Sequence, residues 1–271
     1  MITDVAAQRR LPDAIDTSQP SAARVYDYLL GGKDNYDADR TAAQFVLDVA
    51  PEMADVAREN RRWLVRVVRH LVEQGFDQFI DLGSGLPTQE NVHETAQSLD
   101  LGARVVYVDH DPMVLAHARA LLEAGDGTTA YVHADVRNPR EVLDAPELAR
   151  TIDLTRPVAL LAVAVLHFVA DEDGPARIVR TYADALPSGS RVAIACGSSD
   201  GLTGELAERV RTYFGPDVPS PLYLRSRQEI AALFGDMHLE EPRLVRVTDW
   251  PAPTGTAPLP MTTYGAIGRV P

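Results

Sequence analysis

Hydrophobic residues in the first quarter of the chain recur at the spacing of a helix face. In residues 21–30, Val25, Tyr28 and Leu29 share one face, and Gly31-Gly32 follow where a helix commonly ends. A second, longer amphipathic helix is predicted over residues 53–74, ending at Gly75. Its apolar positions are Met53, Val56, Trp63, Leu64, Val67, Val68 and Leu71.

Beyond Gly75 the pattern changes to short β-rich runs that alternate with helical segments. The predicted strands are residues 78–82, 104–109, 130–134, 158–166, 191–197, 243–249 and 262–270. The predicted helices lie near residues 88–99, 112–124, 139–146, 171–186, 202–214 and 226–234. Apolar strands joined by helices pair in parallel through right-handed crossovers, so a doubly wound α/β sheet is expected. Only the proline-rich loop 250–261 joins the last two strands, so that pair is expected to be antiparallel.

The composition is that of a globular protein, since 45% of the 271 residues are hydrophobic and 24% are charged. The 26 basic and 39 acidic residues give a formal charge of −13, which argues against nucleic acid or an anionic membrane as partner. The longest apolar run, residues 157–170, is shorter than the ~20 residues of a membrane span. Residues 1–20 lack the apolar core of a signal peptide, so we expect a mobile leader and a cytoplasmic protein. The single cysteine, Cys196, provides neither an internal disulfide nor a metal-site spacing.

The first predicted strand runs into a glycine-containing loop, Asp81-Leu82-Gly83-Ser84-Gly85. Ligands of doubly wound sheets bind beyond the carboxyl ends of the strands, beside such a loop. Gly83 and Gly85 permit a tight turn and let a ligand lie against the backbone. The dinucleotide fingerprint requires a third glycine where Thr88, a candidate helix N-cap, stands. The carboxylate of Asp81 suits a cationic group better than a diphosphate, although a solvated turn aspartate is the alternative.

Acidic residues also end the next two predicted strands. Asp109 follows Gly85 by 24 residues, close to the ~20 at which an acidic residue binds ribose hydroxyls in nucleotide-binding sheets. Asp111-Pro112 has the sequence of a helix start, with Asp111 as N-cap. Asp135 followed by Val136 offers a carboxylate for an adenine amino group and an apolar contact for the ring; the alternative is another acid at a helix start.

Taken together, these three acids and the glycine loop resemble the class I S-adenosylmethionine-dependent methyltransferases over residues 75–270. In that family the glycine loop passes under the methionine part, the acid of the second strand holds the ribose and that of the third faces adenine. The run Leu160 to Phe168 is similar to the family's fourth-strand motif. The resemblance implies a seven-stranded Rossmann-like sheet, mostly parallel with one antiparallel strand.

A closer resemblance covers nearly the whole chain. Residues 20–36, 87–93 and 106–112 are similar to the bacterial "S-adenosyl methyltransferase" family long filed as a domain of unknown function. The resemblance implies S-adenosylmethionine as cofactor and an organisation into a leader (1–20), an N-terminal helical cap or lid (21–75) and a methyltransferase domain (76–271). The implied cofactor-binding residues are Asp81, Gly83, Ser84, Gly85, Asp109, His110, Asp135, Val136, Ala162, Asn35 and Tyr36. Pro87 stands where the broader class commonly has a third glycine, so the loop is expected to run differently there.

Two segments have both a functional and a structural interpretation. Residues 31–36 are read as a lid hinged at Gly31-Gly32 that places Asn35 or Tyr36 near the methionine end, or else as a surface turn. His167 follows the fourth strand and is expected to face the cleft as a general base or substrate-orienting partner, or else to be a buried core histidine. His93 is expected at the surface, and packing is the favoured role of Tyr28, Trp63, Trp250 and Cys196.

The function favoured by these patterns is methyl transfer to an oxygen, nitrogen or carbon atom of a small molecule. One alternative is a regulatory protein that binds the cofactor without catalysis. A nicotinamide-dependent oxidoreductase is disfavoured by Asp81 and by Thr88 in place of glycine. The acceptor, the need for a base and the oligomeric state are not determined by the sequence.

Overall fold

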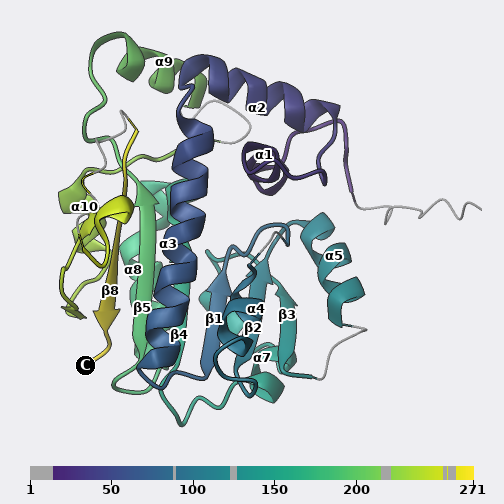
Figure 1. The fold of residues 1–271 in the computed structure, drawn as a ribbon, viewed down its shortest axis with the longest axis vertical. Helices are drawn as coiled ribbons and strands as arrows, with labels where there is room; N and C mark the ends of the chain where they lie inside the picture. Colours follow the sequence, from purple (N-terminus) through teal and green to yellow (C-terminus); the bar gives the residue numbers. More distant parts are fainter. Residues whose placement is uncertain (1–14, 88–89, 123–126, 215–220, 253–254, 256–260) are drawn as a thin grey trace, which may run out of the picture.

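The computed structural model describes residues 15–87, 90–122, 127–214, 221–252, 255 and 261–271. One mixed sheet forms its centre, in the strand order β3-β2-β1-β4-β5-β8-β6, with β7 also paired to β8 (Figure 1). The strands are β1 (Gln78–Leu82), β2 (Arg104–Asp109), β3 (Thr129–His133), β4 (Ala159–Val163), β5 (Arg191–Gly197), β6 (His238–Leu239), β7 (Val245–Arg246) and β8 (Thr263–Arg269). Strands β1 to β5 pair in parallel, and β8 runs antiparallel to its neighbours. The predicted doubly wound sheet with one antiparallel strand is confirmed.

Two predicted strands end differently in the structure. The expected strand 243–249 is confirmed only at β7, Val245–Arg246, which pairs antiparallel with β8; Arg243 adopts a left-handed backbone (φ 65°), and a 3-10 turn follows at Val247–Asp249. The expected strand 158–166 stops at Val163, because Ala164 also has a positive φ of 58°, which an extended strand does not accommodate. A 3-10 turn, Leu166–Phe168, then carries His167.

Helices cover both faces of the sheet and extend above its carboxyl edge (Figure 1). The N-terminal helices are α1 (Ala22–Leu29), α2 (Asp37–Val49) and α3 (Met53–Glu73). Helix α2 was not predicted from the sequence, although Asp37 and Asp39 in its first turn and Pro51 after its end are boundary signals. The other helices are α4 (Val92–Gln97), α5 (Pro112–Leu122), α6 (Pro139–Leu143), α7 (Pro146–Thr151), α8 (Pro175–Ala185), α9 (Gly204–Phe214) and α10 (Arg227–Ala232), with a short 3-10 turn at Asp171–Asp173.

The core divides into two apolar layers because side chains alternate along each strand. Ile80 of β1 packs in the layer under α6, α7, α8 and α10, whereas Phe79 packs in the layer under α3 and α4. In that second layer a Cβ on Gly265 would lie 2.7 Å from Cζ2 of Trp63, so only glycine lets α3 approach β8. Trp63 and Trp250 are buried with ring centroids 6.2 Å apart, and Cys196 is buried, so their predicted packing roles are confirmed; Tyr28 is half-buried.

Among the described residues, no helix combines the length and the apolar character that crossing a bilayer demands.

Candidate functional site

The glycine loop after β1 is a tight turn held against the end of β2. The backbone N–H groups of Gly83 and Ser84 both donate to the carbonyl of Val108, over 2.8 and 3.1 Å. Gly83 and Gly85 have φ values of 68° and 65°, the left-handed region that favours glycine. A Cβ on Gly83 would lie 2.4 Å from Cγ2 of Val165, so the turn after β4 packs directly on this loop. A Cβ on Gly85 would meet no atom within 4 Å, which leaves that side of the backbone open to a ligand.

Asp109 ends β2 and fixes two backbone turns at once. Its Oδ2 accepts a hydrogen bond from the Gly85 N–H over 2.8 Å, and its Oδ1 accepts one from the Asp111 N–H over 3.0 Å. Asp111 in turn accepts from the Met113 N–H over 2.8 Å, which confirms it as the N-cap of α5. Burial raises the pKa of Asp109, against the lowering effect of these N–H groups. Each carboxylate oxygen still has lone-pair capacity for a ligand hydroxyl.

Asp81 lies on the α3 and α4 side of the same edge, opposite Tyr107 in the register of β1 and β2. The carboxyl group is buried, and this burial raises its pKa to about 7, against the lowering influence of Arg61. The Tyr107 hydroxyl lies 2.9 Å from the backbone N–H of His93, which donates to it, and 2.7 Å from the His93 Nδ1. The prediction of a surface His93 is therefore wrong, since the ring is half-buried against Tyr107, a pairing that the sequence motifs did not indicate.

Asp135 follows β3 on the same edge but is bound by its own neighbour. The Arg137 guanidinium donates to Oδ1 and Oδ2 of Asp135 over 3.0 and 2.6 Å, and the Arg137 N–H donates to Oδ1 over 2.8 Å. Burial opposes ionisation of Asp135, but these bonds outweigh it and hold its pKa below the usual value. Val136 is buried in the core, and the His110 side chain is 75% exposed beside Asp109. Sequence reasoning did not identify Arg137 as the partner of Asp135.

The turn after β4 completes this edge. Ala162 is buried within β4, and the Ala164 N–H donates to the carbonyl of Ala195 on β5 over 2.9 Å. The Nδ1 atom of His167 accepts a hydrogen bond from the Gly197 N–H over 3.2 Å. Burial lowers the pKa of His167 to about 4, so the ring is neutral at pH 7.

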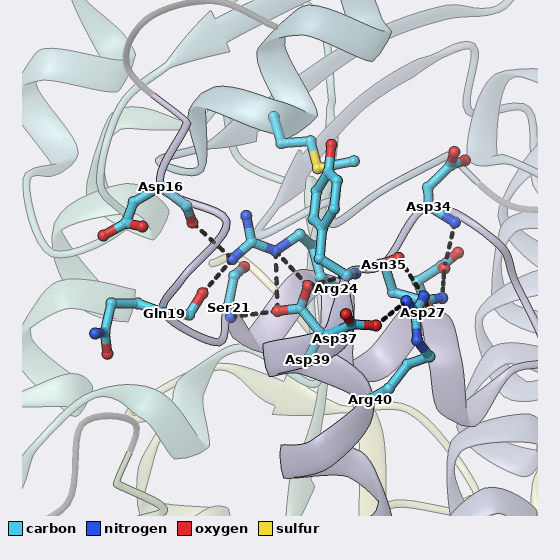
Figure 2. A network of polar contacts seen from close by, with 12 residues as sticks. Asp16, Gln19, Ser21, Arg24, Asp27, Asp34, Asn35, Asp37, Asp39 and Arg40 are labelled. Atoms are coloured by element: carbon cyan, nitrogen blue, oxygen red, sulfur yellow. Dashed lines mark hydrogen bonds and ion pairs between the residues drawn. The ribbon is translucent and has the colours of Figure 1, made fainter.

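The N-terminal segment is held by a buried polar network (Figure 2). Arg24 pairs with Asp39 over 2.9 Å, and both side chains are almost fully buried. Asp39 also accepts from the backbone N–H groups of Ser21 and Tyr36, each over 2.9 Å. The buried face of α1 therefore contains Arg24, Asp27 and Leu29, whereas Val25 and Tyr28 of the predicted apolar face are only half-buried.

Hydrogen bonds to Asp27 hold the segment Gly31 to Tyr36 against α1. Asp27 accepts from the Asn35 side-chain amide over 2.9 Å and from the Asp34 N–H over 3.0 Å. A Cβ on Gly32 would lie 1.9 Å from Oδ1 of Asp27, so glycine lets the segment pack closely against α1. Asn35 is only 8% exposed, and its side-chain amide lies within this network (Figure 2).

This cap contacts the loops that follow β1 and β2. The Ser21 hydroxyl donates to Oδ2 of Asp111. Tyr36 packs in a small apolar cluster with Leu86 of the glycine loop and Met113 of α5. Helices α1 and α2 thus lie over the carboxyl edge of the sheet, whereas α3 packs against its face (Figure 1). Thr88, the candidate N-cap, lies outside the described residues, and α4 begins instead after Asn91, whose capping box includes Glu94.

Comparison with known proteins identifies relatives over the same length. The family model described as S-adenosyl methyltransferase matches residues 8–271. A solved DUF574 family protein from Streptomyces avermitilis MA-4680 is 42% identical, with a TM-score of 0.88 over 94% of this chain and 99% of its own. A proposed methyltransferase from Thermobifida fusca YX is 43% identical, with a TM-score of 0.87 over 96% of this chain and 98% of its own.

More distant similarity extends to the fold alone. The N-methyltransferase NodS from Bradyrhizobium japonicum WM9, solved with S-adenosyl-L-homocysteine, is 14% identical, with a TM-score of 0.50 over 92% of this chain and 99% of its own. No curated protein matches this chain.

Proposed function

This chain belongs to the S-adenosyl methyltransferase family, whose cofactor is S-adenosylmethionine, and we propose that it transfers the cofactor's methyl group to an oxygen, nitrogen or carbon nucleophile of a small molecule. The observation that carries the proposal is the bond from Gly85 to Asp109, which joins an open glycine turn to a buried carboxylate. The open backbone at Gly85 and the carboxylate of Asp109 together suit a ligand that lies against a backbone without side chains and donates two vicinal hydroxyls to an acid.

The residues present fit a nucleoside bearing a cationic amino-acid part. Asp109 would accept from the ribose hydroxyls while Gly83, Ser84 and Gly85 line the methionine part. Asp81 would stabilise the cationic end, since burial already makes its carboxyl sensitive to a nearby positive charge. The further proposed contacts are His110, Val136, Ala162 and Tyr36, with Asn35 acting through the cap. When bound, S-adenosylmethionine supplies an electrophilic methyl group on a sulfonium.

Adenine recognition by Asp135 requires that Arg137 share or release its carboxylate. The Arg137 side chain is half exposed and also lies 3.7 Å from Asp173, so it has a second partner to which it can turn. A carboxylate can accept from both a guanidinium and an amino group, because each oxygen offers two lone pairs. Asp135 therefore remains the proposed adenine contact, with Arg137 as its supporting residue.

The chain's contribution to methyl transfer is positional. An in-line displacement gains most from holding the nucleophile and the methyl group in line and from excluding water. The cap of residues 21–75 would act over the domain 76–271 through α1 and α2, since α3 packs on the sheet, and Ser21 and Tyr36 already contact the loops beside Asp109. His167 would orient the acceptor at the end of β4.

Binding and catalysis need separate tests. Isothermal titration of the full chain with S-adenosylhomocysteine should give a measurable Kd, whereas NAD should not bind. Binding of NAD alone would indicate an oxidoreductase. A screen of metabolite extracts for transfer of labelled methyl then separates an enzyme from a protein that only binds the cofactor.

A further inference from the structure

One hydrogen bond holds the His167 side chain, and a second holds its backbone. Its Nδ1 accepts from the Gly197 N–H at the end of β5, over 3.2 Å, and its own carbonyl accepts from the Tyr223 N–H over 2.8 Å. Val165, two residues earlier in the same turn, packs on Gly83. The imidazole therefore belongs to the turn that touches the glycine loop, at the edge of the sheet where ligands bind.

The bond to Gly197 decides which ring nitrogen carries the proton. A neutral imidazole has one donor nitrogen and one acceptor nitrogen, and a backbone N–H requires an acceptor opposite it. Nδ1 is therefore unprotonated, and Nε2 carries the hydrogen. Burial, together with the nearby Arg225 cation, disfavours a second proton. Other charged or titratable groups of this region are Asp171, Cys196 and Glu229, which all lie near Arg225, and Tyr223, whose carbonyl accepts from Arg225.

Arg225 sets the shape of the turn that carries the imidazole. Its side chain is 4% exposed, and its guanidinium donates to the carbonyls of Leu166 and Val169 over 2.8 and 2.7 Å. Those two residues flank His167 on either side. The third partner is Asp171, whose Oδ1 accepts from Nη2 over 2.7 Å. The planar guanidinium thus holds Leu166, Val169 and Asp171 in one fixed arrangement. The ammonium group of a lysine does not reproduce these directed hydrogen bonds.

From this geometry we infer that His167 acts as a hydrogen-bond donor through Nε2–H and not as a general base, that Arg225 is its positioning residue, and that the methyl acceptor is an oxygen atom. The inference deepens the proposed function and rests on it. An oxygen has lone pairs enough to accept from Nε2–H and still attack the methyl carbon. An amine nitrogen has a single lone pair, which the same donor would occupy.

Such a reaction needs no base from His167. The acceptor hydroxyl loses its proton to solvent before transfer, and the donor stabilises the resulting oxyanion. The oxygen lone pair forms the new O–C bond while the methyl–sulfur bond breaks, and the sulfur retains that electron pair. Acidic hydroxyls of the phenol and enol type are ionised easily enough for this sequence.

Long-range ¹H–¹⁵N correlation spectra of the histidine-labelled full chain test the tautomer directly. The signal of His167, assigned by its absence in His167→Gln, should show an unprotonated Nδ1 and a protonated Nε2 throughout pH 5.5 to 8. A hydrogen on Nδ1, or an imidazolium at pH 6, would overturn the donor role. Isothermal titration of the same sample with S-adenosylhomocysteine tests the proposed function independently of the tautomer. Absence of binding would contradict the proposed function, whatever the tautomer of His167.

Arg225→Lys tests the positioning role. In this variant the ¹H–¹⁵N signal of His167 should split or shift toward the tautomer with a hydrogen on Nδ1. The pKa of His167 should rise, because the turn that holds the imidazole loosens. S-adenosylhomocysteine should still bind. Asp171→Asn weakens the ion pair with Arg225 at a side chain that is 79% exposed. This variant replaces Arg225→Lys in the test if Arg225→Lys does not fold. A wild-type tautomer and pKa in every folded variant would show that Arg225 only supports the fold.

Matched phenols and anilines test the acceptor atom, with S-adenosylhomocysteine formation as readout. Phenols should react, and His167→Gln, whose amide places a donor near the Nε2 position, should retain activity within ~10-fold. His167→Leu should lose ~10²-fold or more, the order expected for a donor to developing charge. Reaction of anilines only, or of neither series, would overturn the oxygen acceptor.

Discussion

At the scale of single residues, Asp109 combines a structural and a binding role. Its carboxylate holds the N–H groups of Gly85 and Asp111, so it shapes the glycine loop before any ligand is present. The sequence interpretation assigned this strand-end acid to the ribose hydroxyls. The structure shows that its removal would also release two backbone turns.

Asp109→Ala is expected to weaken S-adenosylhomocysteine binding by ~2–4 kcal/mol, the cost of losing charged hydrogen bonds. Titration calorimetry measures this change, and the melting temperature of the free variant reports the loosening of the loop. Asp100→Ala is the control, because that exposed carboxylate accepts from the Gly102 N–H in a surface turn. Unchanged affinity in Asp109→Ala would mean that the ribose is bound elsewhere.

The buried carboxyl of Asp81 gives cofactor affinity a pH dependence. With its pKa raised to about 7 by burial, Asp81 is largely protonated at pH 6 and ionised at pH 8. A cationic ligand favours the ionised form, so affinity for S-adenosylhomocysteine should rise by up to ~10-fold per pH unit below pH 7 and level off above it. Asp81→Asn should flatten this profile, and an unchanged slope in that variant would place the titrating group elsewhere.

The same pKa has the opposite effect on the stability of the free protein. A carboxyl group whose folded pKa lies above its unfolded value binds more protons in the folded state, so its contribution is present below pH 4 and lost as pH rises toward about 7. Wild type should therefore lose stability relative to Asp81→Asn over that interval. Denaturant unfolding at pH 5 and pH 8 measures the difference.

At the scale of elements, the junction of α1 and α2 depends on one buried ion pair. Asp39 is fully buried and accepts from Arg24, Ser21 and Tyr36, whereas Asp37, two residues earlier, is 98% exposed in its pair with Arg40. Asp39→Ala should cost ~3–5 kcal/mol by leaving a buried cation unpaired, and Asp37→Ala should cost ~1 kcal/mol or less. Urea unfolding measures both, and equal effects would contradict the importance assigned to burial.

The cap is expected to tighten over bound cofactor. Amides of residues 31–36 and 83–86 should gain protection from hydrogen exchange when S-adenosylhomocysteine is added. Ser21→Ala removes the bond to Asp111 and should weaken ligand binding by ~1 kcal/mol while reducing the gain at residues 31–36. Ser18→Ala, which removes the hydroxyl bond to the side chain of Asp16, is the matched control. A response confined to residues 83–86 would exclude a lid.

At the scale of the whole molecule, the parallel order of β3, β2, β1 and β4 brings Asp135, Asp109, Asp81 and His167 to one edge. Because a ligand bound there contacts the folded chain only, S-adenosylhomocysteine should stabilise the whole protein by RT ln(1 + [L]/Kd), or ~2.7 kcal/mol at a hundred times Kd. Thermal melting at increasing ligand concentration measures this increase. An unchanged melting temperature at millimolar ligand would contradict the cofactor assignment for this chain.

The sequence by itself determined the sheet and the position of the site along it. Alternating strands and helices dictate parallel pairing, and parallel strands must end at a common edge, so Asp81, Asp109 and Asp135 were placed together without coordinates. Local signals also placed Asp111 as an N-cap and Trp63 in the core, because both follow from residue type and spacing over a few positions.

Only the tertiary structure decided which polar groups pair. Three such pairs are Arg24 with Asp39, Asp135 with Arg137, and His93 with Tyr107. Each pair depends on how side chains meet in space, which the spacing of hydrophobic residues along the chain does not indicate. The sequence also did not predict the strand boundaries set by the positive φ of Ala164 and Arg243. Residue type alone does not predict a left-handed backbone at a residue other than glycine. Hydrophobic patterning is a local average over many residues, whereas each of these contacts depends on the exact position of one atom.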